Sequence, residues 1–107
     1  MLLLLDENIP KKLKADFPGH EVLTARGRGW NGLKNGILLQ KLLDHNFNAL
    51  ITYDKNLQHQ QNFIKYPITV FVLSAPINTY PVLTKLSPKI REYLNNPPLP
   101  SGPIEIK

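Results

Sequence analysis

The chain has 107 residues and a formal net charge of +5, with 42% hydrophobic and 20% charged residues. This length and composition correspond to a single globular domain with one substantial core. Because the sequence contains no cysteine, disulfides, thiolate zinc sites and cysteine nucleophiles are excluded, and a reducing, cytoplasmic location is expected. The positive charge favours an acidic partner such as nucleic acid.

The first expected element is a short strand over residues 2–5 (LLLL). A membrane span takes about 20 apolar residues, so we interpret this run as a buried strand and expect no membrane association. A helix follows, with Asn8 as its cap, and Pro18-Gly19 end it. A second strand is expected over residues 20–24 (HEVLT).

The rest of the chain continues to alternate between helix and strand after a glycine-rich basic loop (ARGRGWNGL). The expected elements are a helix from Asn35, its cap, to about residue 45, strands at 49–53 and 68–74, and a helical stretch at 81–94. Within the last of these, Pro88 either kinks the helix or starts a second one behind Ser87.

This alternation predicts an α/β domain, a three-layer α/β/α sandwich with a mostly parallel sheet of four to five strands. The strands lack alternation of apolar and polar residues, as expected where helices cover both faces of a sheet. We assign residues 1–95 to a single domain and residues 96–107 to a Pro-rich tail that ends in a short extended piece at 104–106.

Acidic residues follow two of the predicted strands. Asp6 and Glu7 come after the first strand, and Asp54 follows the third. A doubly wound strand order such as 2-1-3-4 makes these strands neighbours, so both acids would lie at the switch point, where sites form. Converging carboxylates suit Mg²⁺ or Mn²⁺, which can activate water and stabilise charge on a phosphodiester. Alternatively, each acid only caps the next helix or hydrates the rim.

Basic, aromatic and amide side chains offer contacts to nucleic acid. Arg26, Arg28 and Lys34 surround Trp30 in a loop that could hold a phosphate backbone and stack a base. The alternative is that Trp30 packs over the sheet edge while the arginines remain in solvent. The full set of candidates for nucleic-acid contact is Asn8, Lys11, Lys12, Arg26, Arg28, Trp30, Lys34, Asn56, Gln61 and Asn62.

Four segments resemble, in the same order, a short family of PIN-like proteins related to VapC-type toxin nucleases. They are LLLDENIP at the start, GHEV at 19–22, GWNGLKNG at 29–36 and ITYDKNLQHQQN at 51–62. The resemblance implies a PIN-like fold and a metal-dependent endoribonuclease with catalytic and metal-binding acids. It also implies a toxin of a bacterial toxin–antitoxin pair, restrained by a small antitoxin protein, and a possible homodimer.

Carried over onto this chain, Asp6 matches the first acid of the family and Asp54 the acid after the third strand. Glu7 completes the acidic signature with Asn8 and is expected to be a third metal ligand or to orient water. The last motif includes Asn56, Gln61 and Asn62.

One position departs from the family pattern. Relatives typically carry a glutamate after Lys-Asn-Gly, whereas this chain has Ile37. That glutamate would supply a carboxylate from the start of the second helix, so its loss is expected to weaken Mg²⁺ binding.

Two other functions are compatible with the sequence. The first is a catalytically lapsed PIN-like module that binds RNA or a protein partner. The second is a phosphoaspartate receiver, which would use paired acids after strand one, an aspartate after strand three and a lysine after the last strand. No lysine closely follows LSAPINTYP, which counts against the receiver.

Overall fold

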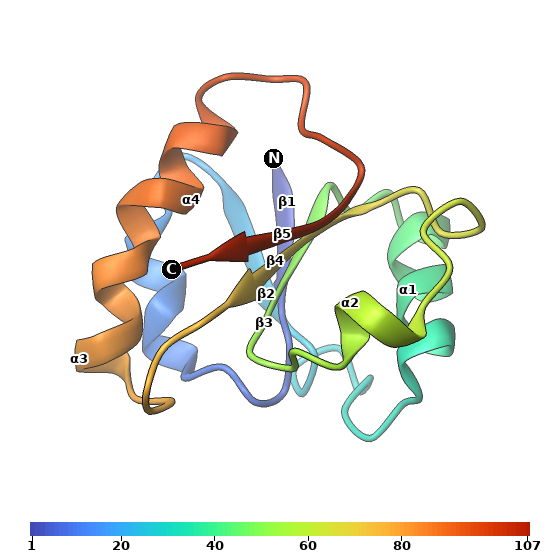
Figure 1. The fold of residues 1–107 in the computed structure, drawn as a ribbon, viewed down its shortest axis with the longest axis horizontal. Helices are drawn as coiled ribbons and strands as arrows, with labels where there is room; N and C mark the ends of the chain where they lie inside the picture. Colours follow the sequence, from blue (N-terminus) through green and yellow to red (C-terminus); the bar gives the residue numbers. More distant parts are fainter.

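The computed structural model describes residues 1–107, except for the side chain of Gln60. Its strands form one sheet in the order β2-β1-β3-β4-β5, and every neighbouring pair is parallel (Figure 1). The strands are β1 (Leu2–Leu5), β2 (Glu21–Thr24), β3 (Ala49–Thr52), β4 (Thr69–Leu73) and β5 (Gly102–Ile106). The expected α/β class is confirmed, as is the adjacency of the first and third strands.

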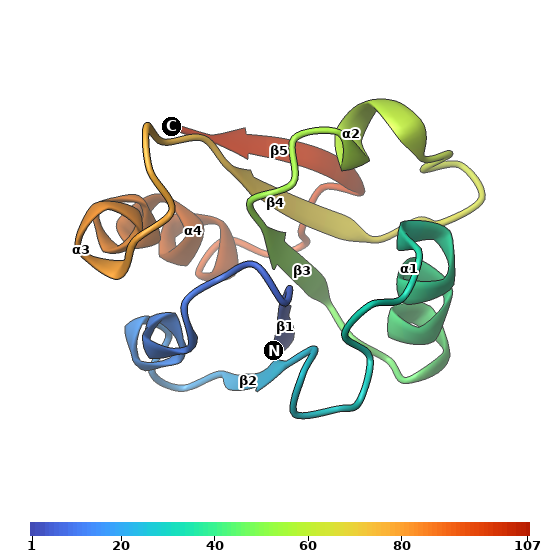
Figure 2. The same cartoon turned by 90° about the horizontal axis from the view of Figure 1, so that it is seen from below.

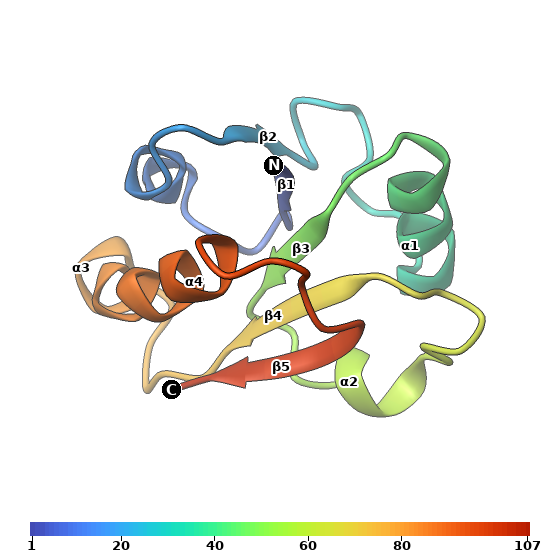
Figure 3. The same cartoon turned by 90° about the horizontal axis from the view of Figure 1, so that it is seen from above.

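Helices cover both faces of the sheet. The α-helices are α1 (Asn35–Asp44), α2 (Leu57–Gln60), α3 (Tyr80–Leu83) and α4 (Ser87–Leu94), and the 3₁₀ helices are η1 (Lys11–Asp16) and η2 (Thr84–Leu86). The segments η1, α3 and α4 pack on one face, while α1 and α2 lie on the other (Figures 2 and 3). The arrangement is a three-layer α/β/α sandwich.

The leucines of β1 supply both apolar layers. Leu3 and Leu5 belong to the cluster that contains Phe17, whereas Leu4 belongs to the opposite cluster with Leu39. Successive side chains of a strand point to opposite faces, so a strand covered on both sides must be apolar at every position. Leu3, Leu4 and Leu5 are all fully buried, which explains why the run ends only where the strand does.

The segment after β1 differs from the expected capped helix. It is the short 3₁₀ helix η1, which begins after Pro10 and receives no capping hydrogen bond from a side chain. Asn8 lies too far upstream to reach the amides of the first turn. Its Oδ1 instead accepts a hydrogen bond from the backbone N–H of Tyr53, at 3.3 Å. The prediction that Asn8 caps this helix is therefore wrong.

The structure also fixes the first residues of α1 and α4. Asn35 is the first residue of α1 rather than its cap, because Lys34 occupies the capping position. The helix α4 begins at Ser87 with Pro88 in its first turn, so the chain adopts the second-helix alternative. Proline fits there because the first amides of a helix have no intrahelical partner.

The Pro-rich tail leads back into the domain. Strand β5 pairs with β4 from Gly102 opposite Thr69 to Ile106 opposite Leu73, and Ile106 is buried in the core. The extended piece expected at 104–106 is thus part of a longer edge strand. Among the described residues, no helix combines the length and apolar character that crossing a bilayer requires.

Candidate active site

Asp6 is a buried carboxylate at the carboxyl end of β1. Its backbone N–H still donates to the carbonyl of Ile51 on β3, at 2.9 Å, so its main chain continues the sheet. Its side chain is only 8% exposed. Oδ2 accepts a hydrogen bond from Thr52 Oγ1 at 2.7 Å, and Oδ1 accepts one from the backbone N–H of Glu7 at 2.9 Å. Both carboxylate oxygens are therefore held in place.

Asp54 lies two residues beyond β3 and connects to Asp6 through Thr52. The Thr52 hydroxyl donates to Asp6 and accepts from the backbone N–H of Asp54, at 3.1 Å. Asp54 Oδ1 accepts from the backbone N–H of Asn56 at 3.0 Å, and Oδ2 accepts from Asn35 Nδ2 at 3.2 Å. The Asp6 carboxylate is thus joined to the backbone of Asp54 through one hydroxyl.

The electrostatics of the site disfavour the charged form of Asp6. Burial raises the pKa of Asp6 above its ordinary value, and the negative charges of Glu7 and Asp54 raise it further. The hydrogen bonds from Thr52 and from the Glu7 amide act in the opposite direction without cancelling the effect. A cation between the carboxylates would relieve this cost, because a bound cation stabilises the charged form.

Glu7 points toward the basic loop. Both of its carboxylate oxygens accept from the backbone N–H of Gly32, each at 3.1 Å. Gly32 has a φ of +80°, a conformation that favours glycine. Among the described side chains, no group of three or more His, Cys, Asp or Glu residues is arranged to hold a metal ion. The role of Glu7 as a third ligand therefore stays a prediction.

The donor set fits a hard divalent cation better than a softer one. Asp6 and Asp54 offer carboxylate oxygens, and no cysteine exists in the chain. Mg²⁺ commonly binds through one or two protein carboxylates and completes its shell with waters and substrate phosphates. Two carboxylates without a closed protein cage match that mode, and the same ligands suit Mn²⁺.

Two of the predicted basic residues lie beside Asp6. Lys11 and Arg26 line a cavity of about 260 Å³ together with Asp6, Glu7 and three further residues, Ile9, Thr24 and Gly27. Lys12 and Lys34 are exposed but do not line this cavity.

Trp30 is buried and not available to stack a base, whereas Arg28 stays exposed. Trp30 is 7% exposed and packs in the core against Phe47 and His45, with ring centroids 5.6 and 5.1 Å away. The guanidinium of Arg28 lies over the Trp30 ring, 4.6 Å from its centroid. The chain adopts the packing alternative, so stacking of a base on Trp30 is not compatible with this arrangement.

The predicted amide contacts mostly serve the fold. Asn8 binds the backbone N–H of Tyr53 and its carbonyl accepts from Asn78. Asn62 Oδ1 accepts from two backbone N–H groups in the turn that follows it. Asn56 is exposed, and its backbone N–H orients Asp54. Gln61 is partly buried, and its Oε1 lies near the backbone of Gly36.

Ile37 does not face the carboxylates. It is 50% exposed and lines a shallow cavity with Lys41, Asp44 and Tyr66, among others, which includes neither Asp6 nor Asp54. The residue of α1 that reaches Asp54 is Asn35. Ile37 comes two residues later in the helix, so its side chain is rotated by about 200° around the helix axis relative to that of Asn35. The expectation that a carboxylate at position 37 would join the cluster is therefore not supported by this geometry.

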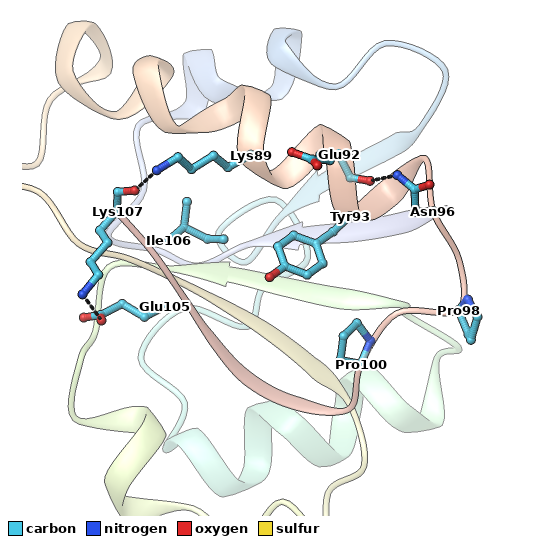
Figure 4. A pocket seen from close by; sticks show the side chains of 9 residues that line it. All are labelled: Lys89, Glu92, Tyr93, Asn96, Pro98, Pro100, Glu105, Ile106 and Lys107. Carbon is cyan, nitrogen blue, oxygen red and sulfur yellow. Dashed lines mark hydrogen bonds and ion pairs between the residues drawn. The ribbon is translucent and has the colours of Figure 1, made fainter.

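A larger cavity, about 800 Å³, lies elsewhere, between α4 and β5 (Figure 4). It contains Tyr93, and Lys107 at the end of β5, whose Nζ lies 3.6 Å from Glu105. The phosphoaspartate receiver requires a lysine after the last strand, and Lys107 does follow β5. Lys107 pairs within this separate cavity, which none of Asp6, Glu7 and Asp54 lines.

Two residues that organise the carboxylates were missed by sequence reasoning. Thr52 is the single polar residue of β3 (ALIT) and is fully buried, which is a signal that its hydroxyl has a buried partner. Asn35 precedes a predicted helix, so the sequence indicates only a capping role for it. Comparisons with family models, curated proteins and solved structures found no match for this chain.

Proposed function

We propose that the protein is a divalent-metal-dependent endoribonuclease of the PIN-like type. The observation that carries the proposal is the connection of Asp6 and Asp54 through Thr52 at the carboxyl ends of β1 and β3. In an open sheet of order 2-1-3-4-5 this is the switch point, where ligands bind. Two oriented carboxylates at that point supply what a hard metal ion requires.

The residues have distinct parts in the proposed reaction. Asp6 and Asp54 would hold Mg²⁺ or Mn²⁺, and that ion, when bound, activates water and stabilises charge on the phosphodiester. Thr52 and Asn35 orient the carboxylates through the hydrogen bonds at 2.7 and 3.2 Å. Lys11 and Arg26 face the cavity beside Asp6 and would attract the phosphate backbone.

The biological setting follows from the motifs. The four segments that resemble short PIN-like relatives of VapC-type nucleases support a toxin of a bacterial toxin–antitoxin pair, acting on cytoplasmic RNA. The net charge of +5 supports a polyanionic substrate. In this setting a small antitoxin protein would restrain the enzyme, and the enzyme itself would form a homodimer.

A catalytically lapsed module that binds RNA is the second candidate, and one observation favours it. The Glu7 carboxylate accepts from the Gly32 N–H, and among the described side chains no three acidic residues are grouped so as to hold a metal ion. Such a module would bind RNA with strong salt dependence, without product and without a requirement for metal.

The test is cleavage of a fluorescent RNA panel in Mn²⁺, in Mg²⁺ and in EDTA. We expect cleavage in either metal that EDTA abolishes and that Asp6→Asn reduces at least a hundredfold. The matched control is Asp44→Asn, which removes an exposed carboxylate on α1 that accepts a hydrogen bond from Gln40. Cleavage that survives Asp6→Asn would overturn the proposal. Salt-sensitive binding without cleavage in the unaltered chain would favour the second candidate.

A further inference from the structure

The cavity that Lys11 and Arg26 share with Asp6 lies on a definite side of the site. Its lining residues follow β1 and β2, and none comes from β3. Asp54, by contrast, follows β3, which borders β1 on its other side. Asp6 therefore lies between Asp54, toward β3, and this cavity, toward β2.

Two cations, Lys11 and Arg26, and two carboxylates, Asp6 and Glu7, line the cavity. Among the described residues, one ion pair within 4 Å is found, between Lys107 and Glu105, so neither Lys11 nor Arg26 pairs with a carboxylate there. Thr24 Oγ1 accepts from the backbone N–H of Gly27 at 2.9 Å, which leaves its proton free to donate. The carboxylate of Glu7 is turned to Gly32. Two cations without an ion-pair partner and one hydroxyl are thus available to an anion once the metal ion of the proposed function neutralises Asp6.

We propose that this cavity is a subsite for a second phosphate, adjacent in the nucleic-acid chain to the one at the Asp6–Asp54 pair. The proposal rests on the proposed function and narrows its substrate class. The substrate is a single strand with at least two consecutive phosphates, because one phosphate lies toward β3 and the next toward β2. A dinucleoside monophosphate fills the first position only, and is a poor substrate.

The kinetic test compares a dinucleoside monophosphate with the same compound carrying a phosphate at its 5′ end or at its 3′ end. We expect one of the two added phosphates to raise kcat/KM at least tenfold, mainly through KM. Lys11→Ala and Arg26→Ala should each reduce that gain at least fivefold, whereas Lys85→Ala, an exposed cation on η2, should retain it. No gain from either phosphate, or a gain that both variants retain, would overturn the subsite.

A binding test separates failure of the subsite from failure of the proposed function. Fluorescence anisotropy of a labelled RNA trinucleotide is measured against salt without divalent ions. It uses Asp54→Asn, which leaves the cavity lining unchanged. Lys11→Ala or Arg26→Ala in that background should weaken binding several-fold. Each should also reduce the slope of log K against log salt by about 1.

If these shifts occur in a protein that never cleaves RNA, the proposed function fails and the phosphate subsite stands. If RNA is cleaved but neither variant shifts binding more than Lys85→Ala does, the subsite fails.

Discussion

Thr52 shows how one hydroxyl can hold two acids in position. Thr52 is fully buried, and its hydroxyl has two hydrogen-bond partners. It donates to Asp6 and accepts from the backbone N–H of Asp54. Buried polar groups are costly unless paired, and here the pairing also orients groups that repel each other. The arrangement fixes the Asp6 carboxylate against the backbone of Asp54.

Thr52→Val tests this role at nearly constant volume. The change leaves the Asp54 N–H and the Asp6 Oδ2 without their partner, so we expect a loss of about 1–3 kcal/mol in the free energy of unfolding. It should also weaken metal-dependent cleavage. Denaturant unfolding measures the first effect. The control is Thr79→Val, an exposed position without a side-chain capping bond, where a change within about 0.5 kcal/mol is expected. Equal stability of the two variants would contradict the bridging role.

At the scale of elements, a polar network fastens η1 to the helices beside it. Asp16 accepts hydrogen bonds from Tyr80, Thr84 and Ser87 at 2.6–2.8 Å, and Arg91 donates to its backbone carbonyl at 3.0 Å. Because η1 has only six residues, its own hydrogen bonds cannot hold it in place. This network therefore positions the segment that carries Lys11.

The Asp16 network makes stability depend on pH. Burial acts to raise the pKa of Asp16, but the hydrogen bonds from Ser87, Thr84 and Tyr80, with the charge of Arg91, outweigh it and lower the pKa. A carboxyl whose pKa is lowered on folding contributes stability above its unfolded pKa. That stability is lost as the pH falls through the folded pKa.

Asp16→Asn should remove that contribution. We expect the variant to be less stable than the unaltered chain at neutral pH and to approach it as the pH falls toward about 2. Urea unfolding from about pH 2 to pH 7 measures the difference, with Asp44→Asn as the control for loss of an acid. A stability difference that does not change with pH would show that the Asp16 charge has no part in the effect.

The start of α1 also permits a sharp test of the expectation that a carboxylate at position 37 would contribute to the site. Ile37 is half exposed and lies on the side of the helix away from Asn35. We therefore expect Ile37→Glu to change the rate of RNA cleavage by less than about twofold, since a glutamate there points away from Asp54. The measurement is the initial rate in Mn²⁺ and Mg²⁺ beside the unaltered chain. A tenfold gain would mean that the first turn of α1 moves toward the carboxylates when metal and RNA bind.

At the scale of the whole molecule, the order of strands creates the site. The connection through η1 places β2 on one side of β1, whereas the connection through α1 crosses to the opposite face and places β3 on the other side. The chain therefore leaves the ends of β1 and β3 uncovered where the winding reverses. Asp6 and Asp54, 48 positions apart in the printed sequence, meet there.

Metal binding should appear in global stability, independently of catalysis. An ion that binds only the folded state stabilises it by about 2.7 kcal/mol at a hundredfold excess over Kd. For a domain of this size the midpoint of thermal unfolding should rise by several degrees. Thermal scans with Mg²⁺ or Mn²⁺ against EDTA measure the shift. Asp54→Asn should abolish it and Asp44→Asn should not. An unchanged midpoint in both metals would contradict the metal site.

Much of the fold follows from local patterns in the sequence. The continuous apolar runs of β1, β3 and β4 predict strands covered on both faces, and the alternation with helices predicts a parallel sheet. The acids Asp6 and Asp54 were found because they directly follow such runs. These inferences hold because burial and backbone periodicity are properties of neighbouring residues along the chain.

Only the tertiary structure decided the partners of those acids. Thr52 contacts Asp6 across 46 positions of the sequence, and Asn35 contacts Asp54 across 19. Trp30 is buried because it packs against His45 and Phe47. The direction of the Ile37 side chain also depends on the orientation in which α1 packs against the sheet. A side chain's partners depend on how distant segments pack in three dimensions, whereas the element it belongs to depends mainly on its neighbours in sequence. The sequence by itself therefore determined the layers and the two acids, and tertiary packing decided which residues orient them and which face a ligand.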